Sequence, residues 1–470
     1  MEILHVALEL APFVKTSPAA EATGGLAKAQ KLLGHEVSVI VPRRPEYELS
    51  GLHPARRLTP LTLSGGGQAH VYEAQLPSGV HLQLVSAPDL SLPVTADALD
   101  DARCSSVSLF AQAVSALWRE RQAQGRAPDV VHFHDAEAAL AALEIGASAP
   151  PDLATLLTVH DARRAGICGL EFRETLGIPA EAASAQAFGH GTDLCLLKGL
   201  LGRVSRVLTP SSAYAAGLGT PERHGALARA FLAAEPVGIS DGVDLALYNP
   251  ATDPALVARY DAASPSAKGI NKSDLEVRLE LDVAPQRPLI AVLPLPAGDG
   301  GLRTVLAALS QIVRMDARLV VCGASLDDEA DRARVQSFQR EVRFTGDLEA
   351  ADLRRVLAGA DFVLSLGSHD PAGIGIKQAA RYGAVPIALG VDGVMDAIVD
   401  ADPELATGTG FLLDSLTQRA LMGGVGRAVS AHRSRAFPTM IKRVMRQDLG
   451  WDRPARQVLR LAQRLRSSLV

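Results

Sequence analysis

The stretch LSLGSHDPAGIGIKQAARYGAVPIA, residues 364–388, decides the fold of this 470-residue chain. Its pattern predicts in turn a buried strand, a polar loop, a short helix and a second buried strand, over residues 361–366, 368–375, 376–382 and 385–389. A strand that leads into such a loop and helix forms an anion site, because loop amides and the helix N-terminus point unpaired N–H groups beyond the sheet edge. The stretch therefore predicts a doubly wound α/β fold and a phosphorylated or nucleotide-bearing ligand.

Strand and helix patterns alternate on either side of this stretch. Apolar runs predict further strands at residues 3–8, 36–41, 130–132, 154–159, 204–209, 289–293 and 319–322. Helical patterns lie between them and include residues 104–121, 136–145 and 302–312. The alternation pauses over the Pro-, Ala- and Asp-rich residues 249–266. Parallel sheets in two domains are therefore expected, with a junction near residue 240 and a C-terminal packing helix over residues 451–469.

Length and composition narrow the class of protein. A chain of 470 residues exceeds what one hydrophobic core usually serves, so two domains of roughly 200 residues each are expected. The net charge of −5 and the aromatic content of 4% argue against a nucleic-acid partner. No apolar run approaches about 18 residues and the N-terminus lacks the basic flank of a signal peptide, which predicts a cytoplasmic protein without a membrane partner.

The residues that most often bind metals form no convincing site. Neither a CxxC motif nor a disulfide-like spacing links the four cysteines, so they are interpreted as buried reduced thiols rather than ligands or nucleophiles. His132 and His134 alternate along a strand and share a face only if that strand runs through both. The turn pattern after them argues against metal ligation by the pair, and no metal is predicted.

Motifs along almost the whole chain resemble the family of bacterial glycogen synthases and plant starch synthases. They are ILHVALELAPFVKT, GHEVSVIVPR, DVVHFHDAEAA, LLTVHD, VLTPSSAYA, GISDGVDLALYNPATDP, INKSDLEVRLEL, TGTGFLLD, QDLGWDRPARQVL and the opening stretch itself. The resemblance implies the GT-B fold, in which two doubly wound, Rossmann-like domains face each other across a cleft. It implies an acceptor-side domain over residues 1–240, a nucleotide-sugar domain over residues 241–445 and a helix over residues 446–470 that packs back on the first domain.

The resemblance also implies a reaction. Family members move glucose from a nucleotide diphosphate sugar, ADP-glucose or UDP-glucose, to the non-reducing end of an α-1,4-glucan with retention. It implies no metal, no cofactor and no covalent nucleophile. His160, at the end of a predicted strand, matches the family's sugar-contacting histidine, although a lone histidine is more often structural. Asp370 stands where the family has a glutamate that faces the donor sugar, so His160 and Asp370 are the candidate catalytic residues.

The first donor loop departs from the family. Where a Lys-Thr-Gly-Gly-Leu loop holds the donor diphosphate, this chain has Lys15, Thr16, Ser17, Pro18 and an alanine. Glycine amides approach an anion closely, whereas proline has no N–H and its ring fills the approach. Lys15 and Thr16 remain donor-binding candidates.

A slid register would restore the glycines of this loop with the Thr-Gly-Gly-Leu of residues 23–26. It needs a gap, places an alanine where the lysine belongs and moves the loop into the helix. We therefore keep the register that starts at Lys15.

The donor loops of the second half have changed as well. Where the resemblance places an arginine and a lysine on the donor phosphates, this chain has Leu295 and Gly300, with Asp299 beside them. Gly298 and Gly300 remain candidates for a weaker amide nest around phosphate.

Two further positions of the opening stretch and its neighbour bear on the same ligand. Gly373 is retained after the acid and is a donor-binding candidate, while Ala372 replaces the usual cysteine. Downstream, Asp392 lies in the segment that replaces the family's phosphate-cradling Thr-Gly-Gly-Leu.

These replacements lead to competing hypotheses. The first is a working glucosyltransferase of the glycogen synthase type. The second is a catalytically impaired relative that keeps the cleft as a binding or regulatory module for a glucan or a protein partner. A third, a transferase with another donor, is opposed by the lost phosphate contacts. Because the replacements gather in the ligand loops, we expect a nucleotide sugar to bind weakly or not at all and an α-glucan or maltooligosaccharide to remain a candidate partner.

Overall fold

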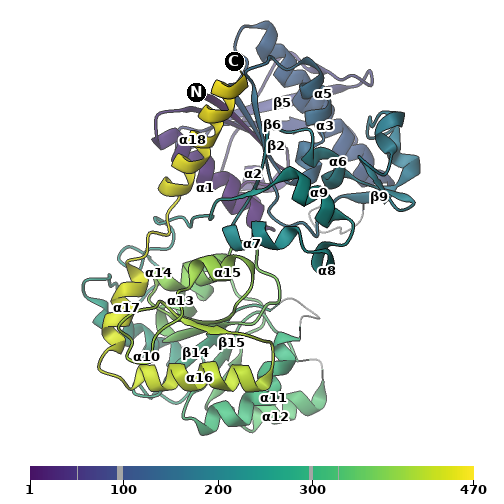
Figure 1. Ribbon diagram of the computed structural model, residues 1–470. Coiled ribbons are helices and arrows are strands. Elements are labelled where there is room, and N and C mark those ends of the chain that lie inside the picture. Colours follow the sequence, from purple (N-terminus) through teal and green to yellow (C-terminus); the bar gives the residue numbers. More distant parts are fainter. Residues whose placement is uncertain (50, 93–98, 296–299, 327, 470) are drawn as a thin grey trace. The chain divides into compact units, whose positions relative to one another are not determined.

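The chain forms two compact α/β units, which are described here one at a time. The computed structural model describes residues 1–49, 51–92, 99–295, 300–326 and 328–469 (Figure 1). Unit 1 comprises Met1–Gly242 together with Trp451–Val470, and unit 2 comprises Val243–Gly450. Within the described ranges, no helix combines the length and the apolar character that crossing a bilayer requires.

Unit 1 is built on a sheet of ten strands among the described residues, in the order β13-β12-β8-β7-β1-β2-β6-β5-β3, with β4 paired to β5. These strands are β1 (Glu2–Val6), β2 (Glu36–Pro42), β3 (Ala55–Arg56), β4 (Leu61–Thr62), β5 (Gln68–Gln75), β6 (His81–Ser86), β7 (Val130–His134), β8 (Ala154–Thr158), β12 (Arg206–Thr209) and β13 (Val237–Gly238). Neighbours from β13 to β6 pair in parallel, and β5 turns back as an antiparallel hairpin partner of β6. A small sheet of β9 (Ile167–Gly169), β10 (Gly189–His190) and β11 (Asp193–Cys195) lies beside it.

Helices cover both faces of the unit 1 sheet. They are α1 (Pro18–Leu32), α2 (Pro45–Leu49), α3 (Asp101–Ala123), α4 (Asp135–Ala139), α5 (Ala142–Ser148), α6 (Leu196–Leu201), α7 (Ser212–Leu218), α8 (Pro221–His224), α9 (Leu227–Ala234) and α18 (Asp452–Leu469). Side chains alternate along parallel strands, so Leu4 of β1 belongs to the core under α3 whereas Ile3 faces α1 and α18. A buried run on both faces is what a central parallel strand requires.

The C-terminal helix α18 is a packing helix of unit 1. It lies against α1 and β8 (Figure 1). The indole of Trp451 sits directly over Gly25 of α1, where an added Cβ would come 2.1 Å from the indole nitrogen. The predicted interpretation of this tail as a packing helix is confirmed within unit 1.

Unit 2 is a parallel sheet of six strands, in the order β16-β15-β14-β17-β18-β19 among the described residues. The strands are β14 (Leu289–Val292), β15 (Arg318–Val321), β16 (Val342–Phe344), β17 (Phe362–Ser365), β18 (Val385–Leu389) and β19 (Phe411–Leu413). The helices are α10 (Lys268–Arg278), α11 (Gly301–Arg314), α12 (Glu329–Gln336), α13 (Ala350–Gly359), α14 (Ile374–Arg381), α15 (Asp392–Ala397), α16 (Gln418–His432) and α17 (Phe437–Met445). The predicted doubly wound, parallel α/β class is confirmed in both units.

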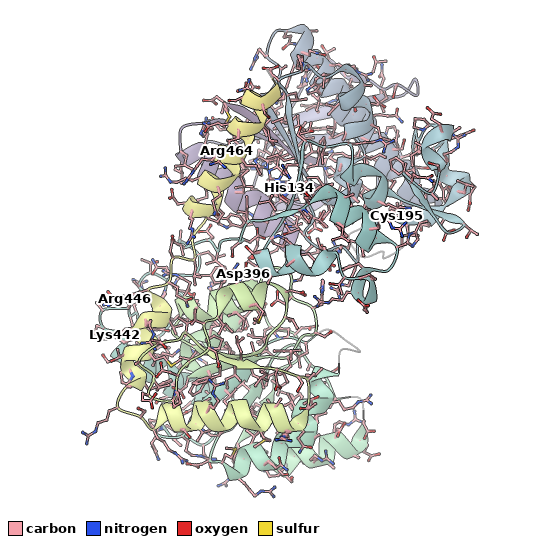
Figure 2. All side chains as sticks on the ribbon, in the orientation of Figure 1. His134, Cys195, Asp396, Lys442, Arg446 and Arg464 are labelled. Atoms are coloured by element: carbon pink, nitrogen blue, oxygen red, sulfur yellow. The ribbon has the colours of Figure 1, made fainter. Side chains whose placement is uncertain are left out.

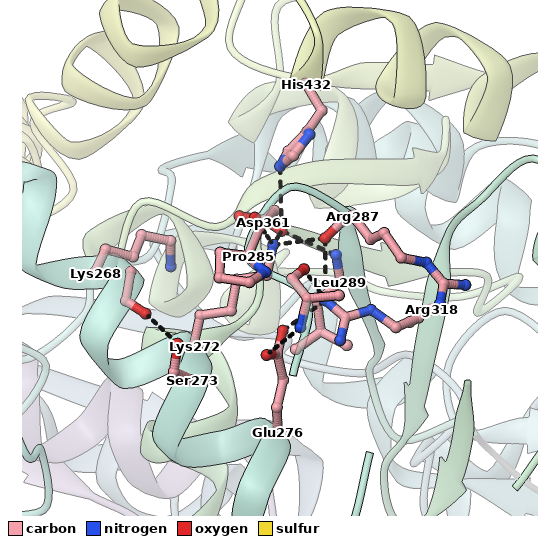
Figure 3. Close-up of polar contacts among 12 residues, drawn as sticks. Lys268, Lys272, Ser273, Glu276, Pro285, Arg287, Leu289, Arg318, Asp361 and His432 are labelled. Atoms are coloured by element: carbon pink, nitrogen blue, oxygen red, sulfur yellow. Dashed lines mark hydrogen bonds and ion pairs between the residues drawn. The ribbon is translucent and has the colours of Figure 1, made fainter. Parts of the chain in front are cut away.

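A buried polar network closes the amino-terminal edge of the unit 2 sheet (Figure 3). Arg318 and Glu276 form an ion pair at 2.5 Å, with both side chains fully buried. Lys272 lies 2.6 Å from a carboxylate oxygen of Asp361, and His432 lies 3.5 Å from the same oxygen. Because ligands of such sheets bind beyond the opposite, carboxyl ends of the strands, this network supports the fold rather than the site.

Several predicted boundaries differ from the structure, and three of the differences lie next to candidate site residues. The strand predicted to end at residue 132 continues to His134, because β1 and β8 both pair with it. The helix predicted over residues 136–145 is interrupted between Ala139 and Ala142 and forms α4 and α5. The helix predicted to begin at residue 376 begins at Ile374, directly after Gly373, whose φ of 64° suits glycine.

All four cysteines are buried free thiols, as the sequence predicts.

Candidate functional site

In unit 1, polar side chains gather where four parallel strands end. The loops after β1, β2, β7 and β8 line an open pocket. Its lining includes Glu9, Ser17, Arg44, His134 and Asp135, which lie far apart in the sequence. The carboxyl edge of a doubly wound sheet is where this class of fold binds ligands.

The predicted donor loop folds back on a carboxylate of its own unit. The backbone N–H groups of Thr16 and Ser17 both donate to Glu9 Oε2, at 2.8 Å and 3.1 Å. The ammonium of Lys15 forms an ion pair with Glu21. Pro18 is the first residue of α1 and supplies no N–H. The two loop amides that resemble a phosphate site are therefore occupied by Glu9.

The alternative register for this loop is wrong. Residues 23–26 lie inside α1. A Cβ at Gly24 would come 2.8 Å from the carbonyl oxygen of Ala11, and Gly25 lies under Trp451. These glycines allow close helix packing and are not a phosphate loop.

His160 is the end of a chain of buried histidines. Its Nε2 lies 3.0 Å from Nδ1 of His134, and Nε2 of His134 lies 3.0 Å from Nδ1 of His5. His5 Nε2 lies 2.7 Å from Oε1 of Gln30 in α1. The interplanar angles along the chain are 11° and 27°, so the imidazoles follow one another almost in one plane. Figure 2 shows His134 in the interior of unit 1.

Burial keeps these imidazoles neutral. It lowers the pKa of His5 to about 4 and also lowers the pKa of His160. The pKa of His134 falls well below its usual value, first through burial and then through repulsion by neighbouring histidines. A neutral imidazole donates through one nitrogen and accepts through the other. With Gln30 as the acceptor, protons therefore point from His160 towards Gln30 all along the chain.

This order leaves Nδ1 of His160 without a proton. Among the described residues that atom has no hydrogen-bond partner, and it lies 3.9 Å from Oδ2 of Asp241. The imidazole thus holds a buried acceptor nitrogen at the end of the histidine chain.

His132 adds a fourth imidazole but no metal geometry. The ligand nitrogens of His5, His132 and His134 lie within 4.8 Å of one another. Their rings, however, are tilted by only 21° to 34° between pairs. Lone pairs lie in the ring planes, and nearly parallel planes do not converge on a single ion. Hydrogen-bonded and stacked imidazoles describe the cluster better than coordination does.

Asp135 carries backbone strain at the end of β7. Its φ is 65°, a region that residues with a side chain enter rarely. Its Oδ1 accepts the backbone N–H of His160 at 2.8 Å. Burial raises the pKa of Asp135 to about 7, and this hydrogen bond opposes the rise. The carboxyl group therefore titrates near neutral pH and holds the loop that carries His160.

In unit 2, Asp370 is turned into its own loop. Its Oδ1 accepts the N–H of Gly373 at 2.8 Å, and burial raises the pKa of the carboxyl group. Its backbone N–H donates to Oδ2 of Asp392 at 3.2 Å. Gly373 is required here, since a Cβ would come 2.8 Å from the carbonyl oxygen of Gly393. Asp370 and Gly373 therefore form one compact turn at the carboxyl end of β17.

Asp392 takes the place of a ligand in this turn. It is buried, its φ is 39°, and its Oδ2 lies 3.3 Å from Nδ1 of His369 as well as near the amide of Asp370. The Asp392 carboxylate thus accepts the N–H of Asp370 and lies beside the imidazole of His369, at the sheet edge where an anion would otherwise bind.

The loop after β14 offers an apolar side chain in place of cations. Leu295 packs against the core of unit 2, close to Gly301 at the start of α11. Gly300 precedes that helix with a φ of 77°. Gly298 and Asp299 lie outside the described residues.

The predicted site residues are divided between the units. Lys15, Thr16 and His160 belong to unit 1, whereas Gly300, Asp370 and Gly373 belong to unit 2. Their convergence on one cleft stays a prediction. Sequence reasoning missed His5 and Glu9, and also the hydrogen bonds that link His5, His134 and His160. A histidine at an inward position of an apolar strand was the available signal for His5.

Comparison with known proteins places these observations in context. The starch synthase catalytic domain matches residues 2–232, and the domain of glycosyl transferases group 1 matches residues 297–436. A glycogen synthase from an Anaeromyxobacter species is 32% identical, with 97% of each chain covered. Glycogen synthase 2 of Agrobacterium fabrum is 30% identical over 99% of this chain and 93% of its own.

Solved structures show the same architecture. The catalytic domain of starch synthase IV from Arabidopsis thaliana, bound to ADP and acarbose, superposes with a TM-score of 0.86 at 21% identity and covers 99% of both chains. A sucrose-phosphate synthase from Thermosynechococcus elongatus gives a TM-score of 0.61 at 16% identity, with both chains fully covered. Both neighbours are GT-B glycosyltransferases, so the predicted fold class is confirmed.

Proposed function

The chain belongs to the family of bacterial glycogen synthases and plant starch synthases, and from this premise we propose that it is a member with an impaired donor site. The reaction of this family is the transfer of glucose from ADP-glucose or UDP-glucose to an α-1,4-glucan. We propose that this transfer is slow or absent and that the protein acts mainly by binding, with an α-glucan or a protein as its partner.

One observation carries the proposal: amides at both predicted phosphate loops donate to carboxylates of the chain itself. Thr16 and Ser17 donate to Glu9 in unit 1, and Asp370 donates to Asp392 in unit 2. A leaving diphosphate gains negative charge in the transition state and needs such donors free. Carboxylates at both places repel the diphosphate as well as occupying its donors.

The absence of two expected cations should also lower the rate of transfer. Leu295 and Gly300 stand where the resemblance expects an arginine and a lysine. Removing one preorganised donor to a developing charge typically costs ~10²–10³ in rate. Losing both, together with the occupied amides, is enough to remove most of the catalysis. Pro18 adds to the loss because it has no N–H.

Retained family positions support the binding role. His160 matches the family's sugar-contacting histidine, and Asp370 stands in the position of the family's glutamate. Starch synthase IV, with the same fold, was solved with ADP and acarbose. We propose that a maltooligosaccharide binds this chain more tightly than ADP-glucose does.

Two measurements test the proposal. Incorporation of labelled glucose from ADP-glucose and UDP-glucose into glycogen should be far below that of an active bacterial glycogen synthase assayed in parallel. Calorimetric titration should detect maltoheptaose binding and weak or no binding of either nucleotide sugar. Robust incorporation that Asp370→Ala abolishes would overturn the impaired-site proposal. Absence of any binding by maltoheptaose would overturn the glucan-binding part.

A further inference from the structure

Three arginines line the pocket of unit 1, each from a different segment. Arg44 follows β2, Arg103 belongs to α3 and Arg164 follows β8. The pocket also holds three acids, so its character depends on which of these charges are already paired. A guanidinium carries five N–H donors in a rigid fork and keeps its charge at all physiological pH values.

Every acid of the pocket already has a donor. Glu9 accepts two backbone N–H groups, those of Thr16 and Ser17. Asp135 accepts the N–H of His160, and burial raises its pKa to about 7, so that part of it is uncharged at neutral pH.

Glu137 completes the set of acids. It accepts from both Nε and Nη2 of Arg103, at 2.8 Å to 3.2 Å. Arg103 and Glu137 are therefore a closed, nearly buried pair.

The other two arginines have no such partner. Within the described part of the chain, neither Arg44 nor Arg164 forms an ion pair. Arg44 donates only to the carbonyl oxygen of Leu8, at 3.3 Å, while its Nε is buried without a hydrogen-bond partner among the described residues. Burial raises the pKa of both Asp135 and Glu137, and the Arg164 guanidinium acts on them only through its field, which opposes that rise. Among the described charged residues of the pocket, the hydrogen-bond donors that remain available thus belong to two cations, Arg44 and Arg164.

We propose that this pocket binds an anionic monosaccharide, a sugar that carries a phosphate or a carboxylate, with Arg44 and Arg164 as its anion-binding residues. Arginine forks match the geometry of both groups, and such charge-assisted hydrogen bonds are about twice as strong as neutral ones. Small-molecule sites are concave and carry a few convergent polar groups, as this pocket does. The side chains of Ser17 and Asp135 line the same pocket and suit sugar hydroxyls.

The N-terminus of α1 adds no free amide to the anion site, because the N–H of Ser17 donates to Glu9 and Pro18 has no N–H. The anion-binding groups of the pocket are therefore the two guanidinium groups. This inference goes beyond the proposed function, because it uses unit 1 alone and holds whether or not the chain transfers glucose.

The test is calorimetric titration of the full-length protein with glucose 6-phosphate, glucuronate, glucose and inorganic phosphate. We expect glucose 6-phosphate or glucuronate to bind at least tenfold more tightly than glucose. Phosphate should compete with the anionic sugar, and raising the salt concentration should weaken binding. Whether the phosphosugar or the uronate binds more tightly assigns the anion. Equal affinity for glucose and both anionic sugars, or binding of none of them, would overturn the inference.

Arginine variants locate the site. Arg164→Gln should weaken binding of the anionic sugar roughly tenfold or more. Arg163→Gln is the matched control, since Arg163 is exposed and pairs with Asp161 at 2.8 Å outside the pocket. Arg44→Gln should act like Arg164→Gln and keeps the test decisive if one variant fails to fold. Unchanged affinity in both pocket variants, with the fold verified by circular dichroism, would refute the assignment.

The result is separable from the test of the proposed function. Labelled-glucose incorporation and maltoheptaose binding report on transfer and on neutral glucan. The affinity ratio between glucose 6-phosphate and glucose reports on the arginines alone.

Discussion

Replacing His5 by glutamine should make unit 1 less stable than in the wild type at neutral pH but more stable than in the wild type near pH 4. His5 is fully buried and neutral, and burial lowers its pKa to about 4 from an ordinary 6.5. A base with a lowered folded pKa contributes stability above its unfolded pKa and loses it as the pH falls through the interval between the two. At about 1.36 kcal/mol for each pH unit, the interval from 6.5 to 4 corresponds to about 3 kcal/mol in the free energy of unfolding.

The variant isolates this contribution. At pH 7.5, His5→Gln should destabilise unit 1 by about 1–2 kcal/mol, because the hydrogen bonds to His134 and Gln30 are disturbed. Near pH 4 the wild-type protein has to protonate a buried imidazole and the variant does not. The difference between them should therefore shrink by about 3 kcal/mol and change sign. Other buried groups, such as Asp135, whose raised pKa acts in the opposite sense, are present in both proteins and largely cancel.

Tryptophan fluorescence offers a direct assay. The chain has two tryptophans, Trp118 and Trp451, and both lie in unit 1. Urea unfolding followed by their emission therefore reports on unit 1, between pH 4.5 and pH 7.5. A difference between wild type and His5→Gln that stays constant over this range would refute the reasoning. His81→Gln serves as a control, since His81 is only half-buried and lies outside the histidine chain.

Three further predictions concern unit 2. Glu276→Ala should destabilise unit 2 by about 3–5 kcal/mol, because Arg318 is left fully buried without its partner; hydrogen exchange of unit 2 peptides measures this, and a smaller loss is expected when Arg318→Leu is added. Leu295→Arg should raise ADP-glucose affinity in calorimetry, and more than Gly300→Lys does, since Gly300 has a φ of 77° that strains any side chain; no gain from either would contradict the missing-cation argument. Asp392→Gly should also raise ADP-glucose affinity, by freeing the amide of Asp370 and relaxing a φ of 39°, and unchanged affinity would show that this carboxylate does not block the donor.

The fold was predictable because its signal is local. Apolar runs of parallel strands and the glycines that end helices are visible in a single sequence. The strand over residues 385–389 lies where the pattern placed it, and α14 ends at Arg381, shortly before Gly383. The errors arose where tertiary pairing overrides the local signal. The residues around His134 predict the start of a turn, yet pairing with Thr158 of β8 holds His134 in the sheet.

The site was predictable only in part, because its chemistry depends on pairing across the fold. The sequence identifies His160 and Asp370 by their place after strands, and the losses at Leu295 and Pro18 by resemblance. It does not reveal which donors are already taken, since Glu9 and the amides it accepts from meet only through the turn after β1.

The two units therefore differ more in which of their charges are already paired than in which residue types they contain. In unit 2, Asp392 has become an internal anion and Leu295 has removed an expected cation, so the site that should hold a diphosphate has no free positive charge at these positions. In unit 1, the acids are satisfied locally, while Arg44 and Arg164 keep their donors. A negative ligand is thus disfavoured at the two donor loops, where Glu9 and Asp392 occupy the amides, and favoured beside Arg44 and Arg164. If this distribution determines binding, adding Leu295→Arg and Asp392→Gly together should increase affinity for ADP-glucose and leave the affinity of unit 1 for glucose 6-phosphate unchanged. A parallel change in both affinities would mean that the two ligands share one site, and the separation argued here would fail.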